Sequence, residues 1–281
     1  MTTADILIEA LPYLQEFHGK LMVIKLGGSI MDDTALLRLV IQDIVLMKQV
    51  GMQPVVVHGG GKHISLLMKR LGKEAVFVNG LRVTDKDTME LTQMVLAGLI
   101  NKDIVSSIGR EGGKAVGISG KDGGLMQAKK MSKDDVDYGH VGEITSIDAS
   151  IIHTLLNNSF IPVISPIAAD TNGDSLNINA DTAAQSIAES LTAQKLIFIT
   201  DVTGVLQDVS KPETLLSIIR KSDIDVLITN GTITAGMIPK LRSAALALDR
   251  GIGSIHIISG RISHSLLLEL FTKQGIGTQI R

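Results

Sequence analysis

The sequence contains no cysteine among its 281 residues. Disulfide bonds, thiolate metal sites and cysteine nucleophiles are therefore excluded, and the composition fits a reducing compartment. Aromatic residues make up only 2% of the chain, which argues against a base-stacking surface for nucleic acid. The formal net charge of −2 likewise lacks the basic excess that is typical of nucleic-acid-binding proteins.

Long apolar runs and targeting segments are also missing. No run approaches the roughly 20 apolar residues needed to span a bilayer. The N-terminus carries Asp5, Glu9 and Glu16 where a signal peptide would have a basic segment followed by an apolar one. We expect a soluble cytoplasmic protein, large enough for one α/β domain or for two domains.

Familiar nucleotide and metal motifs do not occur either. The chain has neither G-x-x-x-x-G-K-[ST] nor G-x-G-x-x-G, which disfavours a P-loop enzyme and an ordinary dinucleotide dehydrogenase. The seven histidines lack the spacing of metal ligands, so we assign no metal-binding residues and interpret His58 as structural.

What is present is an alternation of short apolar runs and helical patterns. Runs typical of strands buried on both faces occupy 21–26, 54–58, 115–119, 161–165, 195–200 and 254–259. Between them, 32–51 predicts a helix capped by Asp32 or Asp33, and 180–193 predicts another opened by Asp181. This order predicts a doubly wound, mostly parallel sheet.

Residues 1–20 form a separate pattern before the first strand. Two stripes fall at helical spacing: Leu7, Leu11, Leu14 and His18, and Ile6, Ala10, Tyr13 and Phe17. The resulting amphipathic helix either packs on its own domain or reaches another subunit, and the pattern favours neither. We place a hinge between a larger and a smaller part of the chain near 191–195.

Glycine-rich turns follow the first strands. Gly27 and Gly28 come after the first strand, and Gly59, Gly60 and Gly61 come after the second. Ligands of open α/β sheets bind beyond the carboxyl ends of strands. A glycine turn that leads into a helix points backbone N–H groups at an anion. One glycine turn on its own is explained by a tight turn that needs positive φ. Two such turns, both at strand ends, favour an anion site.

Five polar residues stand out near these turns. Lys25 interrupts an apolar strand, where an anion offsets its burial unless the side chain reaches the surface. Lys240 begins a helix, although an ordinary surface lysine would fit the same position. Asp181 either caps its helix or holds lysines in place, and Asn177 lies on the same alternating polar stretch. Arg82 lies in a turn and suits bidentate capture of a carboxylate.

In this order, several segments resemble the amino-acid kinase family: "KLGGS", "VVVHGGGK", "NGLRVTD", "GHVGEI", "LNINAD", "TDVTGV" and "GMIPK". The resemblance covers about Leu21 to Arg281, and "NGLRVTD" is most similar to members that phosphorylate N-acetyl-L-glutamate. It implies a three-layer α/β/α sandwich with a mostly parallel central sheet. It also implies an oligomerisation helix at 1–20, an N-acetylglutamate-binding and dimerisation domain at 21–193, and a nucleotide-binding domain at 194–281.

The implied reaction transfers a phosphoryl group from ATP, with Mg²⁺, to the side-chain carboxylate of N-acetyl-L-glutamate, in the second step of arginine biosynthesis. Such a carboxylate, with a reference pKa of about 4.3, is already ionised and needs no general base. By match to the family motifs, Lys25 and Lys240 stabilise the transition state from opposite sides, and Asp181 holds both lysines and reaches magnesium.

The resemblance also implies the binding residues. Arg82 clamps a substrate carboxylate, Asn177 fixes the amino-acid end, and Gly28, Gly59 and Gly60 offer backbone N–H groups. The nucleotide-binding residues implied are Gly27, Gly28, Asp201, Val202, Thr203, Gly204, Val205, Leu206, Thr232, Ile233 and Thr234.

Both ends of the chain resemble arginine-inhibited family members, in which an N-terminal helix links dimers into a hexamer. This implies feedback inhibition by L-arginine, with Glu269 as the guanidinium partner and Tyr13, His256, Gly275 and Gly277 around it. The leucine after Lys25 departs from the tyrosine usual in those members. The rival interpretations are a kinase for an aminoadipate derivative and a catalytically inactive arginine sensor.

Overall fold

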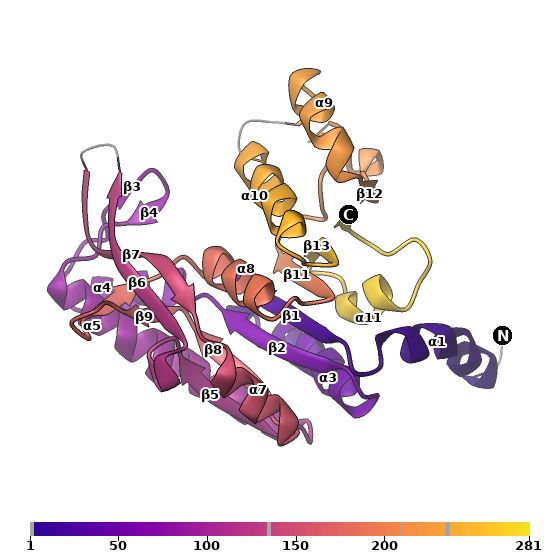
Figure 1. Ribbon diagram of the computed structural model, residues 1–281, viewed down its shortest axis with the longest axis horizontal. Coiled ribbons are helices and arrows are strands. Elements are labelled where there is room, and N and C mark those ends of the chain that lie inside the picture. Colours follow the sequence, from indigo (N-terminus) through magenta and orange to yellow (C-terminus); the bar gives the residue numbers. More distant parts are fainter. Residues whose placement is uncertain (1–2, 134–135, 209, 234–236) are drawn as a thin grey trace.

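The computed structural model describes residues 3–133, 136–208, 210–233 and 237–281 of the chain. Its centre is one eight-stranded sheet with the order β12-β14-β13-β11-β1-β2-β8-β5 (Figure 1). All the strands predicted from the sequence are in this sheet: β1 (Leu21–Leu26), β2 (Gln53–His58), β5 (Ala115–Ser119), β8 (Ile161–Ser165), β11 (Lys195–Thr200) and β13 (Ser254–Ser259). They pair in parallel, which confirms the predicted sheet. Two short strands at one end, β12 (Ile218–Ile219) and β14 (Thr278–Ile280), are not apparent from the sequence, and β14 runs antiparallel to β13.

Helices cover both faces of the sheet, so the molecule is the expected three-layer sandwich (Figure 1). Successive β1 side chains enter opposite cores: Ile24 and Leu26 enter one core, and Val23 enters the other. The first core is covered by α3 (Thr34–Gln49), α4 (Gly61–Arg70), α5 (Lys86–Gln93), the π-helix η1 (Met94–Ile100), α6 (Asn101–Arg110) and α11 (Ser265–Leu270). The second core is covered by α7 (Ser150–Asn157), α8 (Ala180–Ser190) and α10 (Ile238–Asp249).

A long hairpin that is not apparent from the sequence rises beside the central sheet (Figure 1). It consists of β6 (Met126–Lys133) and β7 (Val136–Ile147), which close into a small barrel with β9 (Ile167–Ala169) and β10 (Ser175–Asn177). The pair β3 (Phe77–Val78) and β4 (Leu81–Arg82) lies next to it. Apart from the N-terminal helix, the remaining described elements are short: α2 (Gly28–Met31), α9 (Ile224–Thr229), η2 (Asp122–Gly124), η3 (Pro212–Thr214) and η4 (Lys221–Asp223).

Two helix starts show where the capping prediction holds and where it is wrong. At α3, Oδ1 of Asp33 accepts the N–H groups of Ala35 and Leu36 at 2.9 and 3.1 Å, so Asp33 is the cap. At α8 the cap is Asn179 and not Asp181, because Oδ1 of Asn179 accepts the N–H of Asp181 at 2.9 Å. The helix begins at Ala180, as its predicted range does, so Asp181 lies in the first turn and its carboxylate is left free for another partner. The predicted division at residue 193 falls in the short connection between α8 and β11, and it stays a prediction.

The predicted N-terminal helix is α1 (Thr3–Phe17), which extends away from the sheet in Figure 1. Its last turn packs on its own fold, because Phe17 is buried and Tyr13 contacts Phe271 edge-to-face with 6.4 Å between ring centres. Ile8 and Leu11 instead are 68% and 43% exposed. One helix therefore both closes the core and presents apolar side chains to solvent.

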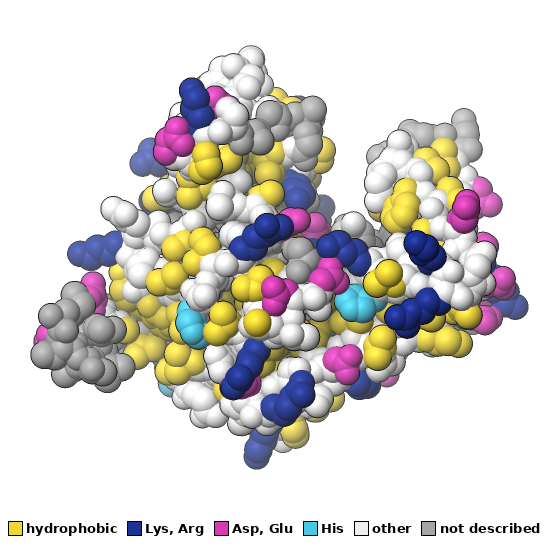
Figure 2. Space-filling view, turned by 180° about the vertical axis from the view of Figure 1, so that it is seen from behind, with side chains coloured by type: hydrophobic (Ala, Val, Ile, Leu, Met, Phe, Trp, Pro, Cys, Tyr) yellow, Lys and Arg dark blue, Asp and Glu magenta, His cyan; other side chains and the backbone are white. Residues whose placement is uncertain are grey.

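The surface carries charges of both signs. Basic and acidic side chains are interspersed over the face shown in Figure 2, in keeping with a net charge of −2. Within the described part of the chain, no helix combines the length and apolarity that a bilayer crossing requires.

Candidate active site

The candidate site lies where neighbouring parallel strands end together. β1 lies in register between β2 and β11, so the glycine turns that follow β1 and β2 are neighbours. Lys25 shares the face of Val23, which α8 covers, because side chains two apart in a strand point the same way. Its Nζ lies 2.8 Å from Oδ1 of Asp181, in the first turn of α8. The fold therefore joins two of the three residues predicted to be catalytic.

This ion pair lies at the border between the interior and solvent. The side chain of Lys25 is 14% exposed, and that of Asp181 is 43% exposed. Oδ1 of Asp181 is buried and has no hydrogen-bond partner among the described residues, so its contact with Lys25 is electrostatic, while the exposed part of the side chain leaves the carboxylate open to a ligand. The described residues contain no group of three or more acidic, histidine or cysteine side chains that would suit a metal ion.

A cavity of about 200 Å³ opens beside the pair. It brings together all four residues predicted to bind the acceptor substrate, which are Gly59, Gly60, Arg82 and Asn177. The other described lining residues are Gly61, Ile64, Phe77, Gly80, Leu81, Leu96, Val141, Pro166, Ile178, Asn179 and Ala180. Arg82 is the single charged residue of this described lining, so the cavity suits a small molecule with both an anionic group and apolar parts.

Arg82 is held firmly at the cavity wall. Its Nη2 donates to the carbonyl oxygen of Gly61 at 2.7 Å and to Oγ of Ser65 at 2.8 Å, and its guanidinium lies 4.7 Å from the ring centre of Phe77. Burial lowers the pKa of Arg82 from its ordinary value, as expected for a cation withdrawn from water. Arg82 forms no ion pair with the described residues. The carboxylate of a ligand can therefore pair with this fixed and buried cation.

The glycine turns are close-packed at two positions. A Cβ on Gly27 would lie 2.6 Å from the carbonyl oxygen of Ile199, and one on Gly60 would lie 2.4 Å from Cδ1 of Ile100. The N–H of Gly59 already donates to the carbonyl oxygen of Leu26 at 3.3 Å, whereas the N–H of Gly60 has no partner among the described residues. Of these two predicted backbone donors, Gly60 is therefore the one that is free.

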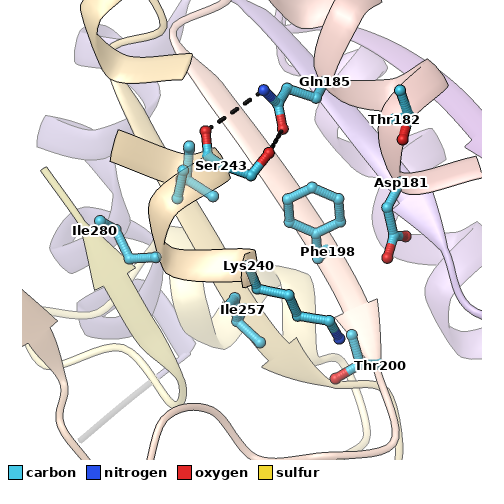
Figure 3. Close-up of a pocket in the computed structure, with 11 residues that line it drawn as sticks. Asp181, Thr182, Gln185, Phe198, Thr200, Lys240, Ser243, Ile257 and Ile280 are labelled. Carbon is cyan, nitrogen blue, oxygen red and sulfur yellow. Dashed lines mark hydrogen bonds between the residues drawn. The ribbon is translucent and has the colours of Figure 1, made fainter. Parts of the chain in front are cut away.

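A second cavity, of about 90 Å³, lies between α8 and α10 (Figure 3). Asp181 lines it from α8 and Lys240 lines it from α10, and the Lys240 side chain extends toward Thr200 at the end of β11. Lys240 is exposed and pairs with no carboxylate among the described residues, so of the two predicted lysine partners Asp181 holds only Lys25 here. Because Ala180 lines the first cavity and Asp181 the second, the two cavities lie on either side of the first turn of α8.

None of the residues predicted to bind the nucleotide is among the described residues that line this second cavity, although Thr200, which does line it, directly precedes one of their segments. Residues 201–206 directly follow β11, and the N–H of Val205 donates to Oγ1 of Thr278 at 2.8 Å, a contact that the sequence did not indicate. The side chains of Val205 and Ile233 are only 2% and 4% exposed and pack in the core, so their backbones alone are left for a ligand. Thr234 lies outside the described residues.

Most of the residues predicted to bind arginine form a buried cluster. Nδ1 of His256 lies 2.6 Å from Oε1 of Glu269, whose Oε2 accepts the N–H groups of Ile276 and Gly277 at 2.8 and 3.1 Å. Burial lowers the pKa of His256, so a neutral imidazole donates its Nδ1–H to the carboxylate. Burial alone would raise the pKa of Glu269, but these hydrogen bonds outweigh it and hold the pKa below 4.5. A Cβ on Gly275 would lie 2.6 Å from Oε2 of Glu269.

Lys195 completes this cluster, and sequence reasoning missed it. Its Nζ lies 3.1 Å from Nε2 of His256 and 5.0 Å from the ring centre of Phe17, so α1 covers it. Burial lowers the pKa of Lys195. The available signal was a lysine at the head of the apolar run "KLIFIT".

A lysine–carboxylate pair between two cavities at the carboxyl edge of a parallel sheet is an arrangement suited to a phosphotransferase, a class of enzyme that brings two anionic substrates together. The sequence pattern of the amino acid kinase family matches residues 20–259. The chain belongs to the amino acid kinase family.

Several known proteins are similar to this chain over nearly its whole length. The chain is 50% identical to the acetylglutamate kinase of Methanocaldococcus jannaschii, over 99% of this chain and 95% of that protein. It is 52% identical to the acetylglutamate kinase of Desulfitobacterium hafniense, over 98% and 95% of the two chains. Among solved structures, N-acetylglutamate synthase from Neisseria gonorrhoeae with coenzyme A and N-acetyl-glutamate superposes with a TM-score of 0.87 at 26% identity. That match covers 100% of this chain and 63% of the synthase.

Proposed function

We propose that this enzyme transfers the terminal phosphoryl group of ATP to the side-chain carboxylate of N-acetyl-L-glutamate, in the second step of arginine biosynthesis. The observation that carries the proposal is the cavity walled by Gly60, Arg82 and Asn177, which opens beside the Lys25–Asp181 pair. The names of the relatives that match nearly the whole chain support the same substrate. We place the reaction in the cytoplasm.

The residues explain how two anions can meet. Arg82 supplies an unpaired buried cation for a carboxylate of the substrate, and Asn177, whose Nδ2 donates to Oγ1 of Thr84 at 3.2 Å, is oriented to contact the amino-acid end. The acceptor carboxylate is ionised at neutral pH and attacks without a general base. Lys25 from β1 and Lys240 from α10 then stabilise the charge on the phosphoryl group in transfer.

Magnesium fits the site through the nucleotide. Asp181 has a carboxylate whose side chain is 43% exposed, and carboxylate oxygens are the ligands that Mg²⁺ takes together with substrate phosphates. When bound, Mg²⁺ neutralises phosphate charge. Asp181 would then hold both the metal ion and Lys25 from one helix turn.

The direct test is acyl-phosphate formation with ATP and magnesium, comparing N-acetyl-L-glutamate, L-glutamate and N-acetyl-L-aminoadipate. Strong preference for N-acetyl-L-glutamate is the expected result. Activity with the aminoadipate derivative alone would retain the phosphate chemistry and refute the substrate. The expected discrimination over one methylene is about 10- to 200-fold, because a single methylene is worth about 1–3 kcal/mol.

We further propose feedback inhibition by L-arginine at the Glu269 cluster, in a hexamer joined through α1. Glu269 is a buried carboxylate, Lys195 and His256 adjoin it, and α1 forms the cover. The likeness to a synthase that has been solved with coenzyme A and L-arginine, at 25% identity and a TM-score of 0.83, gives independent support. Ile8 and Leu11 on the exposed side of α1 would meet another subunit.

The test asks whether α1 is needed for the hexamer and for inhibition by arginine, while the rest of the fold is left intact. Because Phe17 is buried, we would remove only residues 1–12, and in parallel substitute Ile8→Asp in the full chain. Both variants should be dimeric by light scattering and much less sensitive to arginine, with catalysis retained. A hexamer that is fully inhibited in both would refute the role of α1.

A further inference from the structure

Helices α8 and α10 are joined by side chains one turn beyond the candidate catalytic residues. Gln185 lies four residues after Asp181, and Ser243 lies three after Lys240, so each pair shares one helix face. Oγ of Ser243 donates to Oε1 of Gln185 at 2.5 Å, and Nε2 of Gln185 lies 3.4 Å from the backbone oxygen of Ser243 (Figure 3). We call this contact the α8–α10 clasp.

The clasp is anchored along α8. Nε2 of Gln185 also donates to Oε1 of Glu189 at 2.8 Å, and Oε2 of Glu189 accepts from Nη1 of Arg250 at 3.0 Å. Arg250 follows the last residue of α10, so the two helices are joined at two levels. Two attachment points fix the angle between the helices as well as their separation.

Packing does not replace the clasp at this level. The cavity of about 90 Å³ separates the helices over Phe198 and Ile257, so few atoms resist a change in their spacing there. Apolar contacts are also non-directional, whereas a hydrogen bond between two short side chains sets a definite position. The chain thus has a polar pair beside a gap between the two helices.

We propose that the Gln185–Ser243 clasp is a positioning device that sets the place of Lys240 relative to Asp181 and Lys25. Asp181 and Lys25 form one fixed half of the site, and Lys240 enters from the other helix without an ion pair of its own among the described residues. The clasp also crosses the predicted boundary between the substrate and nucleotide domains. This inference rests on the proposed function for its kinetic readout.

The kinetic test uses Ser243→Ala and Gln185→Ala, with Ser190→Ala as the matched control on an exposed position of α8. A hydrogen bond of this kind changes an equilibrium by a factor of about 2 to 12. We expect kcat to fall by up to about tenfold in the clasp variants, with KM for N-acetyl-L-glutamate within twofold, because the acceptor cavity is untouched. Ser243→Thr keeps the hydroxyl and should recover kcat.

A second comparison separates positioning from general damage. If the clasp acts through Lys240, Ser243→Ala should have no further effect in a Lys240→Ala background. A drop that persists in that background, or clasp variants that match Ser190→Ala in kcat, would overturn the proposal.

A distance measurement keeps the test independent of the substrate. Since the chain has no cysteine, Ser190→Cys and Leu246→Cys place spin labels on exposed positions of α8 and α10 alone. The distance distribution with a non-hydrolysable ATP analogue should be narrow, and it should broaden or shift when Ser243→Ala is added. If Ser243→Ala leaves the distance distribution unchanged, the positioning role of the clasp is overturned. If the parent enzyme is inactive on N-acetyl-L-glutamate, only the proposed function is refuted.

Discussion

Replacing Lys25 by methionine tests the centre of the site with little disturbance of the fold. The substitution keeps an unbranched stem in β1 and removes the charge that lies 2.8 Å from Asp181. Two unit charges about 4 Å apart interact by about 4 kcal/mol at an effective dielectric constant of about 20. Loss of one preorganised donor to a transition-state charge costs about 2.7–4 kcal/mol, or about 10²- to 10³-fold in kcat. We expect a loss of that size in kcat with a small change in KM.

Stability should barely change in the same variant. Asp181 is 43% exposed, so water can solvate it once its partner is gone, and partly exposed ion pairs contribute about 1 kcal/mol or less. The thermal midpoint should therefore move by no more than about 4 °C. The assay is ADP release in a coupled reaction, with Lys20→Met as the control, because Lys20 is an exposed lysine next to the same strand. A kcat within fivefold of the parent, in a folded Lys25→Met enzyme, would refute the assigned role.

Other outcomes follow from single positions. Burial lowers the pKa of His58 from 6.5 to about 4. The neutral imidazole therefore contributes about 3 kcal/mol to the free energy of unfolding, and this contribution is present above pH 6.5 and lost as the pH falls toward 4. Urea unfolding across this range should show that slope, and His58→Asn should flatten it. Gly27→Ala should lower the free energy of unfolding by about 1–3 kcal/mol, because the added Cβ meets the backbone of β11. The Cβ of Gly28→Ala lies in open space, so this control variant should be as stable as the parent. Arg82→Lys should raise KM for N-acetyl-L-glutamate at least tenfold with a smaller effect on kcat, since lysine cannot reproduce the guanidinium fork; an unchanged KM would count against the assigned role.

The central sheet could be predicted because its strands are buried on both faces and appear as uninterrupted apolar runs. The β6–β7 hairpin could not, since β7 has an irregular burial pattern and β6 has two register shifts against it, so neither strand alternates cleanly. The cap of α8 was mistaken because Asn179 and Asp181 are both good caps, and only the actual start of the helix decides between them.

The candidate site was predictable where a residue type was out of place. A lysine inside an apolar strand and three glycines at a strand end are unusual in themselves, so they can be recognised from the sequence without knowing which residues lie near them in the fold. Gln185, Ser243 and Thr278 carry no such signal, because polar residues on helices and short strands are ordinary, and their meaning arises only from what the fold places opposite them. Lys195 lies between these cases, as it opens a strand where surface lysines are common.

The position of β1 has a consequence for how the chain is made. β1 pairs with β2 on one edge and with β11 on the other. As the chain leaves the ribosome, β1 can pair with β2 once residue 58 has emerged, but its second edge stays open until residues 195–200 follow. An open apolar strand edge recruits other chains. Among the strands that are paired on both edges in this sheet, the strand that carries Lys25 is thus the one that waits longest for its second neighbour, and chaperone dependence during synthesis should decline sharply when β11 emerges.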